Sequence, residues 1–179
     1  LCLADASDAA YGTVAEVVRE YADRDSRIVY QKLEKNFGIS ENTNCCIRMA
    51  TGTYLALFDH DDMLHPSALY ECAKVIEENG AQFVYTDEVT FEGSSLENII
   101  TYHFKPDFSV DNLRGVNYIC HLSVFQKELV DQVGMFRPEY DGSQDHDIIM
   151  RLTDATEIVC HIPKVLYFWR CHAQSTSMN

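Results

Sequence analysis

The stretch YLALFDHDDMLHP, residues 54–66, joins a core-like apolar segment to a cluster of acids. The apolar residues predict a buried strand, which Asp59, Asp61 and Asp62 follow at once. Acids so close raise each other's pKa and cost stability unless a cation or hydrogen-bond donors lie beside them. Two interpretations follow. The acids hold a hard divalent cation, or they form a polar turn in which Asp61 or Asp62 caps the helix that begins near Pro66.

Apolar strands and helices of 3.6-residue periodicity alternate along the chain. The pattern predicts strands at 1–4, 27–33, 53–58, 82–89, 157–162 and 165–170, and helices at 13–25, 41–50, 66–79, 126–134 and 143–155. Ser40 is expected to cap the helix at 41–50, and Gly80 to end the helix at 66–79. The connection at 92–109 is expected to be irregular. The alternation predicts an α/β fold with a mostly parallel sheet, and one domain over residues 1–179 is the simplest count.

Three predicted strands end in an acid, at Asp5, Asp59 and Asp87. Ligands of parallel α/β sheets bind at the carboxyl ends of the strands, so we expect one acidic crevice there. In an extended backbone Asp59 and Asp61 would point to the same side, as paired ligands of Mg²⁺ or Mn²⁺ do.

Two further candidates lie in the second half of the chain. Asp145 in GSQDHD begins a predicted helix, where the helix dipole stabilises a carboxylate, so it is either a general base or a helix cap. His172 in WRCHAQSTS is either a metal or phosphate ligand or a solvated side chain.

The composition excludes some classes of function. The chain carries 28 acidic and 14 basic residues, which argues against nonspecific nucleic-acid binding. It contains no apolar run of the roughly 20 residues that a membrane helix needs. The 7 cysteines show no CxxC spacing, so a zinc site is not expected. Their apolar surroundings predict buried thiols in a cytoplasmic protein.

Six segments together resemble family 2 glycosyltransferases of the GT-A fold: LADASD, NFGISENTN, ATGTYLALFDHDD, YTDE, GSQDHDIIMRL and YFWRCHAQSTS. The bacterial rhamnosyltransferase-like group is the most similar. The resemblance implies a Rossmann-like sheet flanked by helices. It also implies that the family's first strand and helix, with the loop that contacts the nucleotide, lie upstream of Leu1, so the chain is expected to be truncated at its amino terminus.

The resemblance also assigns roles to individual residues. It places Asp5, Asn36, Gly38 and Asn44 at the nucleotide, Asp59 at the ribose, and Asp61 and His172 at the metal. Asp145 matches the catalytic base, and Gln144 stands where the family has Glu. Asp87 and Glu88 fall near the donor sugar or the acceptor.

The implied reaction is the metal-dependent, inverting transfer of a sugar from a nucleotide-sugar to a glycan or lipid-linked acceptor in polysaccharide synthesis. Any membrane contact is expected to come from the upstream or downstream parts of the protein. Two alternatives remain: a noncatalytic nucleotide-sugar or glycan-binding domain, and a phosphohydrolase that uses Asp59 as nucleophile. The donor, the nucleotide base and the acceptor are not specified by the sequence.

Overall fold

The computed structural model describes residues 1–7 and 13–171. Contacts within it divide the chain into two compact units, each formed by segments that are distant in the sequence. Unit 1 comprises Leu1–Gly52 and Gly134–Ile148, and unit 2 comprises Thr53–Val133 and Ile149–Asn179. The expectation of one domain over residues 1–179 stays a prediction.

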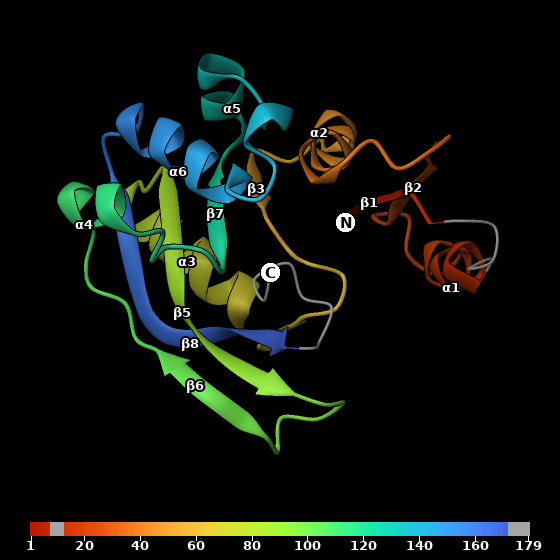
Figure 1. The fold of residues 1–179 in the computed structure, drawn as a ribbon, viewed down its shortest axis with the longest axis horizontal. Helices are drawn as coiled ribbons and strands as arrows, with labels where there is room; N and C mark the ends of the chain where they lie inside the picture. Colours follow the sequence, from red (N-terminus) through yellow and green to blue (C-terminus); the bar gives the residue numbers. More distant parts are fainter. Residues whose placement is uncertain (8–12, 172–179) are drawn as a thin grey trace. The chain divides into compact units, whose positions relative to one another are not determined.

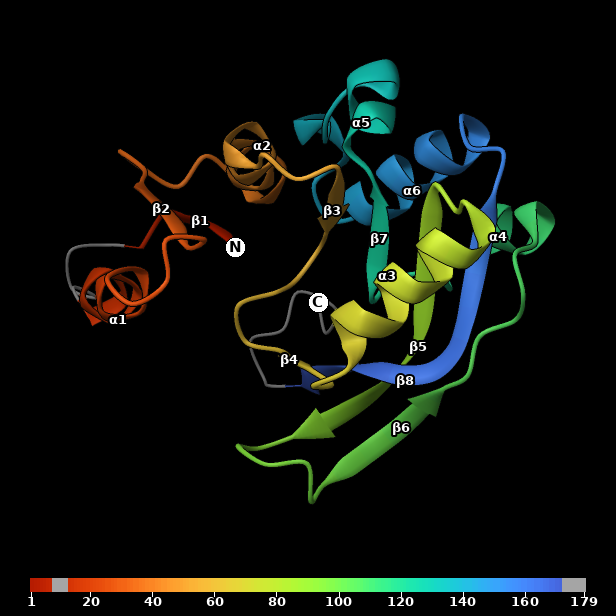
Figure 2. The same ribbon diagram turned by 180° about the vertical axis from the view of Figure 1, so that it is seen from behind.

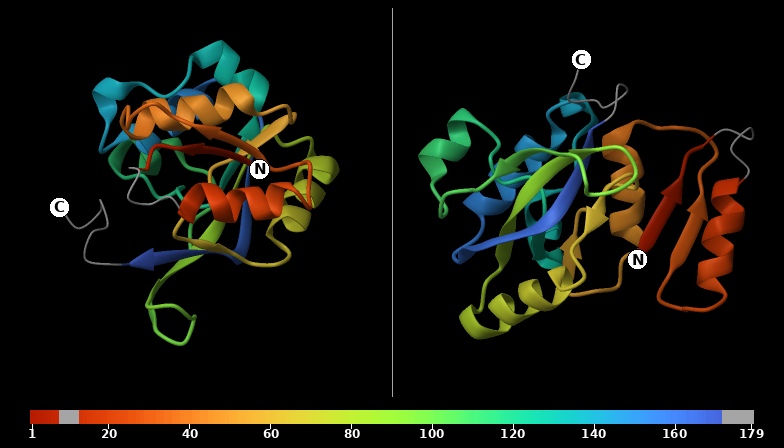
Figure 3. Two further views of the ribbon diagram at one scale, coloured as in Figure 1. Left: turned by 90° about the vertical axis from the view of Figure 1, so that its right-hand side faces the viewer. Right: turned by 90° about the horizontal axis from the view of Figure 1, so that it is seen from below.

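Unit 1 is built on two parallel strands. Strand β1 (Cys2–Asp5) pairs with β2 (Val29–Lys32), so that Asp5 lies opposite Lys32. Figure 3 shows helices α1 (Thr13–Ala22) and α2 (Ile39–Met49) on opposite sides of these strands. The remaining elements are the short 3-10 helix η2 (Pro138–Tyr140) and the beginning of α6 (Gln144–Asp154).

Unit 2 is a six-stranded sheet with helices (Figures 1 and 2). Its strands follow the order β3-β7-β5-β8-β4, with β6 paired to the second half of β5. The strands are β3 (Tyr54–Ala56), β4 (Met63–Leu64), β5 (Phe83–Glu92), β6 (Ile99–His103), β7 (Ser123–Gln126) and β8 (Val159–Cys171). The helices are α3 (Ala68–Asn79), α4 (Val110–Gly115), α5 (Lys127–Val133) and the second part of α6.

The sheet of unit 2 is mixed, whereas the sequence predicted a mostly parallel one. Within the described residues, β5 and β8 run parallel, as do β1 and β2 in unit 1, and the other pairings are antiparallel. The connection from β5 to β6 explains part of the difference. A short loop permits only a hairpin, since a parallel pairing needs a long crossover. The α/β class itself holds.

The core of unit 2 lies on both faces of β5, which is buried from Phe83 to Phe91. Under α3, a cluster joins the helix to the sheet; it contains Ala68, Cys72, Ala81, Val84, Leu122, Val124, Ile162, Leu166 and Tyr167. Burial on both faces accounts for the apolar start of β5, residues 83–85, whereas Thr86, Asp87, Glu88 and Thr90 are buried although they are polar. The cysteines were expected to be buried. Cys72 is buried, and the other six are half-buried.

A bulge interrupts the β5–β8 pairing at Asp87. Thr86 pairs with Ile162 and Asp87 with Val165, so Pro163 and Lys164 have no partner position on β5. Pro163 has no N–H to donate, and such a residue is tolerated in a sheet at a bulge. The strands predicted at 157–162 and 165–170 are therefore one bent strand, visible as the curve of β8 in Figure 1.

Most predicted elements are confirmed, with differences at their ends. Gly80 closes α3 in the left-handed conformation, as expected. Ser40 is not the cap of α2, because the helix begins one residue earlier, at Ile39. Asp87 does not end its strand, because β5 continues to Glu92 and pairs with β6, within a connection predicted to be irregular.

Candidate functional site

The predicted site residues fall into two groups that are described separately. Unit 1 holds Asp5, Asn36, Gly38, Asn44 and Asp145, and unit 2 holds Asp59 and Asp61. His172 lies outside the described residues.

Asp5 is a buried carboxylate at the end of β1, with 4% of its surface exposed. One oxygen accepts from the backbone N–H and the hydroxyl of Ser7, at 2.8 and 2.5 Å. The other accepts from the Tyr30 hydroxyl at 2.7 Å and lies 3.2 Å from the Lys32 ammonium. Burial by itself would raise the pKa of Asp5, but these donors hold it well below its usual range. Asp5 is therefore a fixed negative charge at the end of β1.

Asn36 and Gly38 shape the loop before α2. The Asn36 side-chain oxygen accepts from the Gly38 N–H at 3.0 Å and from the Asn42 amide at 2.9 Å. Gly38 has φ of +95°, and a Cβ built on it would lie 2.7 Å from Oδ2 of Asp141. The other oxygen of Asp141 accepts from the Ser40 N–H at 3.2 Å. The cap of α2 thus comes from residue 141, not from Ser40.

Gly38→Ala is expected to destabilise the start of α2 by about 1–3 kcal/mol, since it combines a strained φ with a clash against Asp141. Hydrogen exchange of the α2 amides in wild type and variant measures this difference. Gly115→Ala is the matched control, because a Cβ at Gly115 has no heavy atom within 4 Å. Equal exchange protection in G38A and wild type would refute the strain argument.

Asn44 ties α2 to the segment that follows residue 134. Its amide nitrogen donates to the Phe136 carbonyl at 2.9 Å and to Glu41 at 3.1 Å. Its amide oxygen accepts from the Phe136 N–H at 2.9 Å. The side chain is buried, and its nitrogen and oxygen both form hydrogen bonds within unit 1. A role for Asn44 at the nucleotide stays a prediction.

Asp145 lies in the first turn of α6, half-buried, beside the buried side chain of Gln144. The Gln144 amide nitrogen donates to Asp145 Oδ2 at 2.8 Å. Burial raises the pKa of Asp145 to about 6, and the hydrogen bond from Gln144 opposes part of that rise. Within the described part of the chain, the other oxygen, Oδ1, accepts no hydrogen bond. Asp145 therefore combines a pKa near neutrality with an oxygen that can accept a proton.

The acids of the opening stretch form a turn in unit 2, because the Asp62 N–H donates to the Asp59 carbonyl at 3.3 Å. The backbone is not extended there. The argument that Asp59 and Asp61 point to the same side, which required an extended backbone, therefore does not apply. Asp59 is exposed, Asp61 half-buried and Asp62 buried. The Asp59 carboxylate lies 3.9 Å from Nε2 of His121, and burial lowers the pKa of His121 to about 4.

Strand β8 holds this turn through two residues that the sequence analysis did not select. The Tyr167 hydroxyl donates to Asp62 Oδ2 at 2.5 Å and accepts from the Asp59 N–H at 3.3 Å. The Arg170 backbone N–H donates to Asp62 Oδ1 at 2.7 Å, and its Nε donates to the Asp61 carbonyl at 2.6 Å. Asp62 therefore finds hydrogen-bond donors where like charge alone would repel. The signal in the sequence that could have identified them is the presence of a tyrosine and an arginine, both hydrogen-bond donors, in an otherwise apolar strand.

Tyr167→Phe is expected to lower the free energy of unfolding of unit 2 by about 1–3 kcal/mol, because a buried carboxylate loses a donor. Urea unfolding followed by the fluorescence of the single tryptophan, Trp169, reports this change. Tyr70→Phe, at a side chain 68% exposed on α3, is the control and should stay within about 0.5 kcal/mol of wild type. Equal losses of unfolding free energy in both variants would show that the hydrogen bond from Tyr167 to Asp62 does not stabilise unit 2.

Asp87 and Glu88, expected near a ligand, are engaged by neighbouring side chains. Asp87 Oδ1 accepts from the Lys105 N–H at 2.9 Å and lies 2.8 Å from Nε2 of His161. Glu88 pairs with the Lys105 ammonium at 3.1 Å, with both side chains buried. These contacts explain the burial of both acids by partners within unit 2, without a ligand.

The donor chemistry of the turn suits a hard cation in part. Asp59, Asp61 and Asp62 bring carboxylates, the ligand type that such a cation prefers, and both oxygens of Asp62 accept hydrogen bonds from Tyr167 and Arg170. Among residues 1–7 and 13–171, no group of three or more His, Cys, Asp and Glu side chains is arranged to hold a metal ion. A role for Asp61 as a metal ligand therefore stays a prediction.

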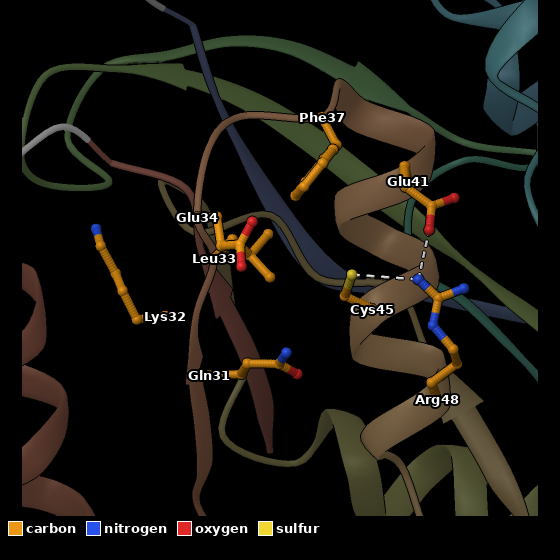
Figure 4. A pocket seen from close by; sticks show the side chains of 8 residues that line it. All are labelled: Gln31, Lys32, Leu33, Glu34, Phe37, Glu41, Cys45 and Arg48. Atoms are coloured by element: carbon orange, nitrogen blue, oxygen red, sulfur yellow. Dashed lines mark hydrogen bonds and ion pairs between the residues drawn. The ribbon is translucent and has the colours of Figure 1, made fainter.

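A pocket of about 410 Å³ lies between β2 and α2 in unit 1, and none of the predicted site residues lines it (Figure 4). On the α2 side of the pocket three groups bind one another: the Arg48 guanidinium lies 2.5 Å from Glu41 and donates to the Cys45 sulfur at 3.2 Å. The other lining residues are Gln31, Lys32, Leu33, Glu34 and Phe37.

The profile of the family described as Glycosyl transferase family 2 matches residues 5–134. The chain belongs to this family. Among curated proteins, "Uncharacterized protein y4gI" of Sinorhizobium fredii is 42% identical over 100% of this chain and 20% of that protein. The "O-antigen biosynthesis protein RfbC" of Myxococcus xanthus is 34% identical over 95% of this chain and 13% of that protein. The chain thus spans a fifth or less of these relatives.

Among solved structures, TarS 1-349 of S. aureus in complex with UDP-GlcNAc superposes with a TM-score of 0.80 at 16% identity. The match covers 99% of this chain and 51% of that one. This likeness confirms the GT-A fold that the sequence predicted. No helix in the described part of this family 2 chain is long and apolar enough to cross a membrane.

Proposed function

We propose that this family 2 chain carries the catalytic centre of an inverting glycosyltransferase, which moves a sugar from a nucleotide-sugar to a glycan or lipid-linked acceptor. The observation that carries the proposal is Asp145: a half-buried carboxylate with a pKa of about 6 and one oxygen that accepts no hydrogen bond from the described residues. A general base works best when its pKa lies near the working pH. Family membership and the name of the O-antigen relative support the substrate class.

The proposed reaction is a single displacement at the anomeric carbon. Asp145 takes the proton of the acceptor hydroxyl through Oδ1 while that oxygen forms a bond to the anomeric carbon. The bond from this carbon to the diphosphate oxygen breaks, and the configuration inverts. Asp5 and the loop of Asn36 and Gly38 would bind the nucleotide, and Asp59 the ribose.

We propose that Asp61, with His172, would hold a divalent cation, Mn²⁺ or Mg²⁺. When bound, such an ion supplies positive charge that stabilises the departing diphosphate. We also propose, as a finer assignment, that the donor sugar is rhamnose or a hexose, as in the rhamnosyltransferase-like group. The name of the O-antigen relative is compatible with this assignment.

The test is a transfer assay on the full-length protein with UDP-, GDP- and dTDP-sugars, with and without Mn²⁺. The expected result is a glycosylated product of inverted anomeric configuration, formed from one class of donor and lost with EDTA. Binding of nucleoside diphosphates without transfer would leave the noncatalytic alternative. A phospho-aspartyl adduct on Asp59 would point to a phosphohydrolase instead.

The pH dependence of kcat/KM is a further prediction. Because the base must be ionised, and because the pKa of Asp145 is raised to about 6, kcat/KM should rise with pH through about 6 and then level off. An ordinary aspartate would place this limb near 4. A flat profile between pH 5 and pH 7, measured with saturating metal, would contradict the assignment.

A further inference from the structure

Gln144 contacts both the proposed base and the loop before it. Its Oε1 accepts from the Gly142 N–H at 2.8 Å, and its Nε2 donates to Asp145 Oδ2 at 2.8 Å. The side chain is buried, with 7% of its surface exposed. Since a backbone N–H can only donate, the amide oxygen must face Gly142, and the NH₂ group must therefore face Asp145.

This arrangement needs a side chain that accepts at one end and donates at the other. A glutamate, the residue that the family resemblance implied here, accepts from Gly142 when ionised but has no proton for Asp145. It would also place a second negative charge beside Asp145, which makes ionisation of both groups unfavourable. Glutamine satisfies both neighbours without adding a charge.

The other charged groups around this turn have different partners. Asp141, in the preceding loop, accepts from the Ser40 N–H of α2. Asp147, in the same first turn of α6, pairs with Arg137. On α2, Glu41 pairs with Arg48. His146, next to Asp145 in the sequence, has an interaction of its own. Among the described residues, the hydrogen bond to the Asp145 carboxylate is the one from Gln144.

We propose that Gln144 is a positioning residue for the base: its amide ties one oxygen of Asp145 to the Gly142 loop and leaves the other oxygen to face the acceptor hydroxyl. This inference rests on the proposed function of Asp145. The geometry that carries it is the chain of two hydrogen bonds through a buried amide whose orientation is fixed.

Two variants separate positioning from packing. Gln144→Met keeps the volume and removes both hydrogen bonds, and Gln144→Glu keeps the shape, replaces the donor and adds a charge. The matched control is Gln31→Glu, an exposed glutamine on β2. In the full-length protein, the acid limb of the kcat/KM profile should move to higher pH in Q144M and further in Q144E, by about 1–3 pH units in Q144E, since a like charge is added. Q31E should match wild type.

A second readout is independent of catalysis. Carbon-13 NMR titration of the Asp145 carboxyl in the same proteins should give midpoints in the order wild type, Q144M, Q144E, with wild type near 6. Coincident midpoints, or any other order, would overturn the role of Gln144. If wild type transfers no sugar, the proposed function fails while the titration still decides the inference. If Q144E does not fold, Q144M against wild type decides it.

Discussion

Replacing Asp145 by Asn in the full-length protein is expected to lower kcat by about 10²–10⁴-fold, because an amide cannot take the proton of the acceptor hydroxyl. The side chain keeps its size, and its carbonyl oxygen can still accept from Gln144. Donor binding should therefore change little, so the loss should appear in kcat more than in KM. Steady-state kinetics with the donor found in the transfer assay measures both quantities.

Asp154→Asn is the matched control for this experiment. Asp154 lies on the same helix, α6, but is exposed at its last residue. We expect its kcat to stay near that of wild type. A D145N protein that turns over at the wild-type rate would show that the base is another group. Equal losses in both variants would point to a general effect on α6.

Replacing Lys105 by Met is expected to lower the free energy of unfolding of unit 2 by about 3–5 kcal/mol, the usual cost of leaving one charge of a buried pair alone. The Lys105 ammonium lies 3.1 Å from Glu88 and also donates to the carbonyls of Ile119 and His121. Methionine leaves these acceptors without their donor. Burial lowers the pKa of Lys105 and raises that of Glu88, so both charges depend on their pairing.

Urea unfolding monitored at Trp169 gives the size of this effect. The control is Lys164→Met at the Lys164–Glu71 pair of 2.8 Å, where the lysine side chain is 52% exposed and the expected cost is about 0–1 kcal/mol. The double variant Glu88→Gln with Lys105→Met should recover part of the loss, because it removes the unpaired charge. A loss in K105M no larger than that in K164M would show that the buried pair contributes little.

The sequence predicted helices and strands well where the apolar periodicity agreed with the residues that typically begin or end such elements. The helix at 143–155 was found because Ile148, Ile149 and Leu152 share one face, and all three are fully buried. Gly80 ended α3 because only glycine takes the left-handed conformation there readily. Periodicity failed at Leu69: its spacing from Cys72 and Ile76 predicts a side chain that faces inward from α3, but Leu69 is 63% exposed. Its face of the helix depends on how the sheet beneath is arranged, which local spacing does not encode.

The candidate site was predicted as residues but not as an arrangement. Asp59, Asp61 and Asp145 could be selected from their position at the end of a strand or the start of a helix. Their environments could not, because Tyr167 and Arg170 hold the acidic turn from more than a hundred positions away. The cap of α2 likewise comes from Asp141, which is distant in the sequence.

The sequence by itself determined the α/β alternation, the family and which acids are candidates for its chemistry, since these depend on residue type and short spacing. Only the tertiary structure decided that the strands of unit 2 form a mixed sheet, that Asp62 in YLALFDHDDMLHP accepts hydrogen bonds from Tyr167 and Arg170 of β8, and that the Gln144 amide donates to Asp145. The physical reason is that hydrogen bonds and burial act through space. A carboxylate takes its pKa and its partners from whatever the fold brings beside it.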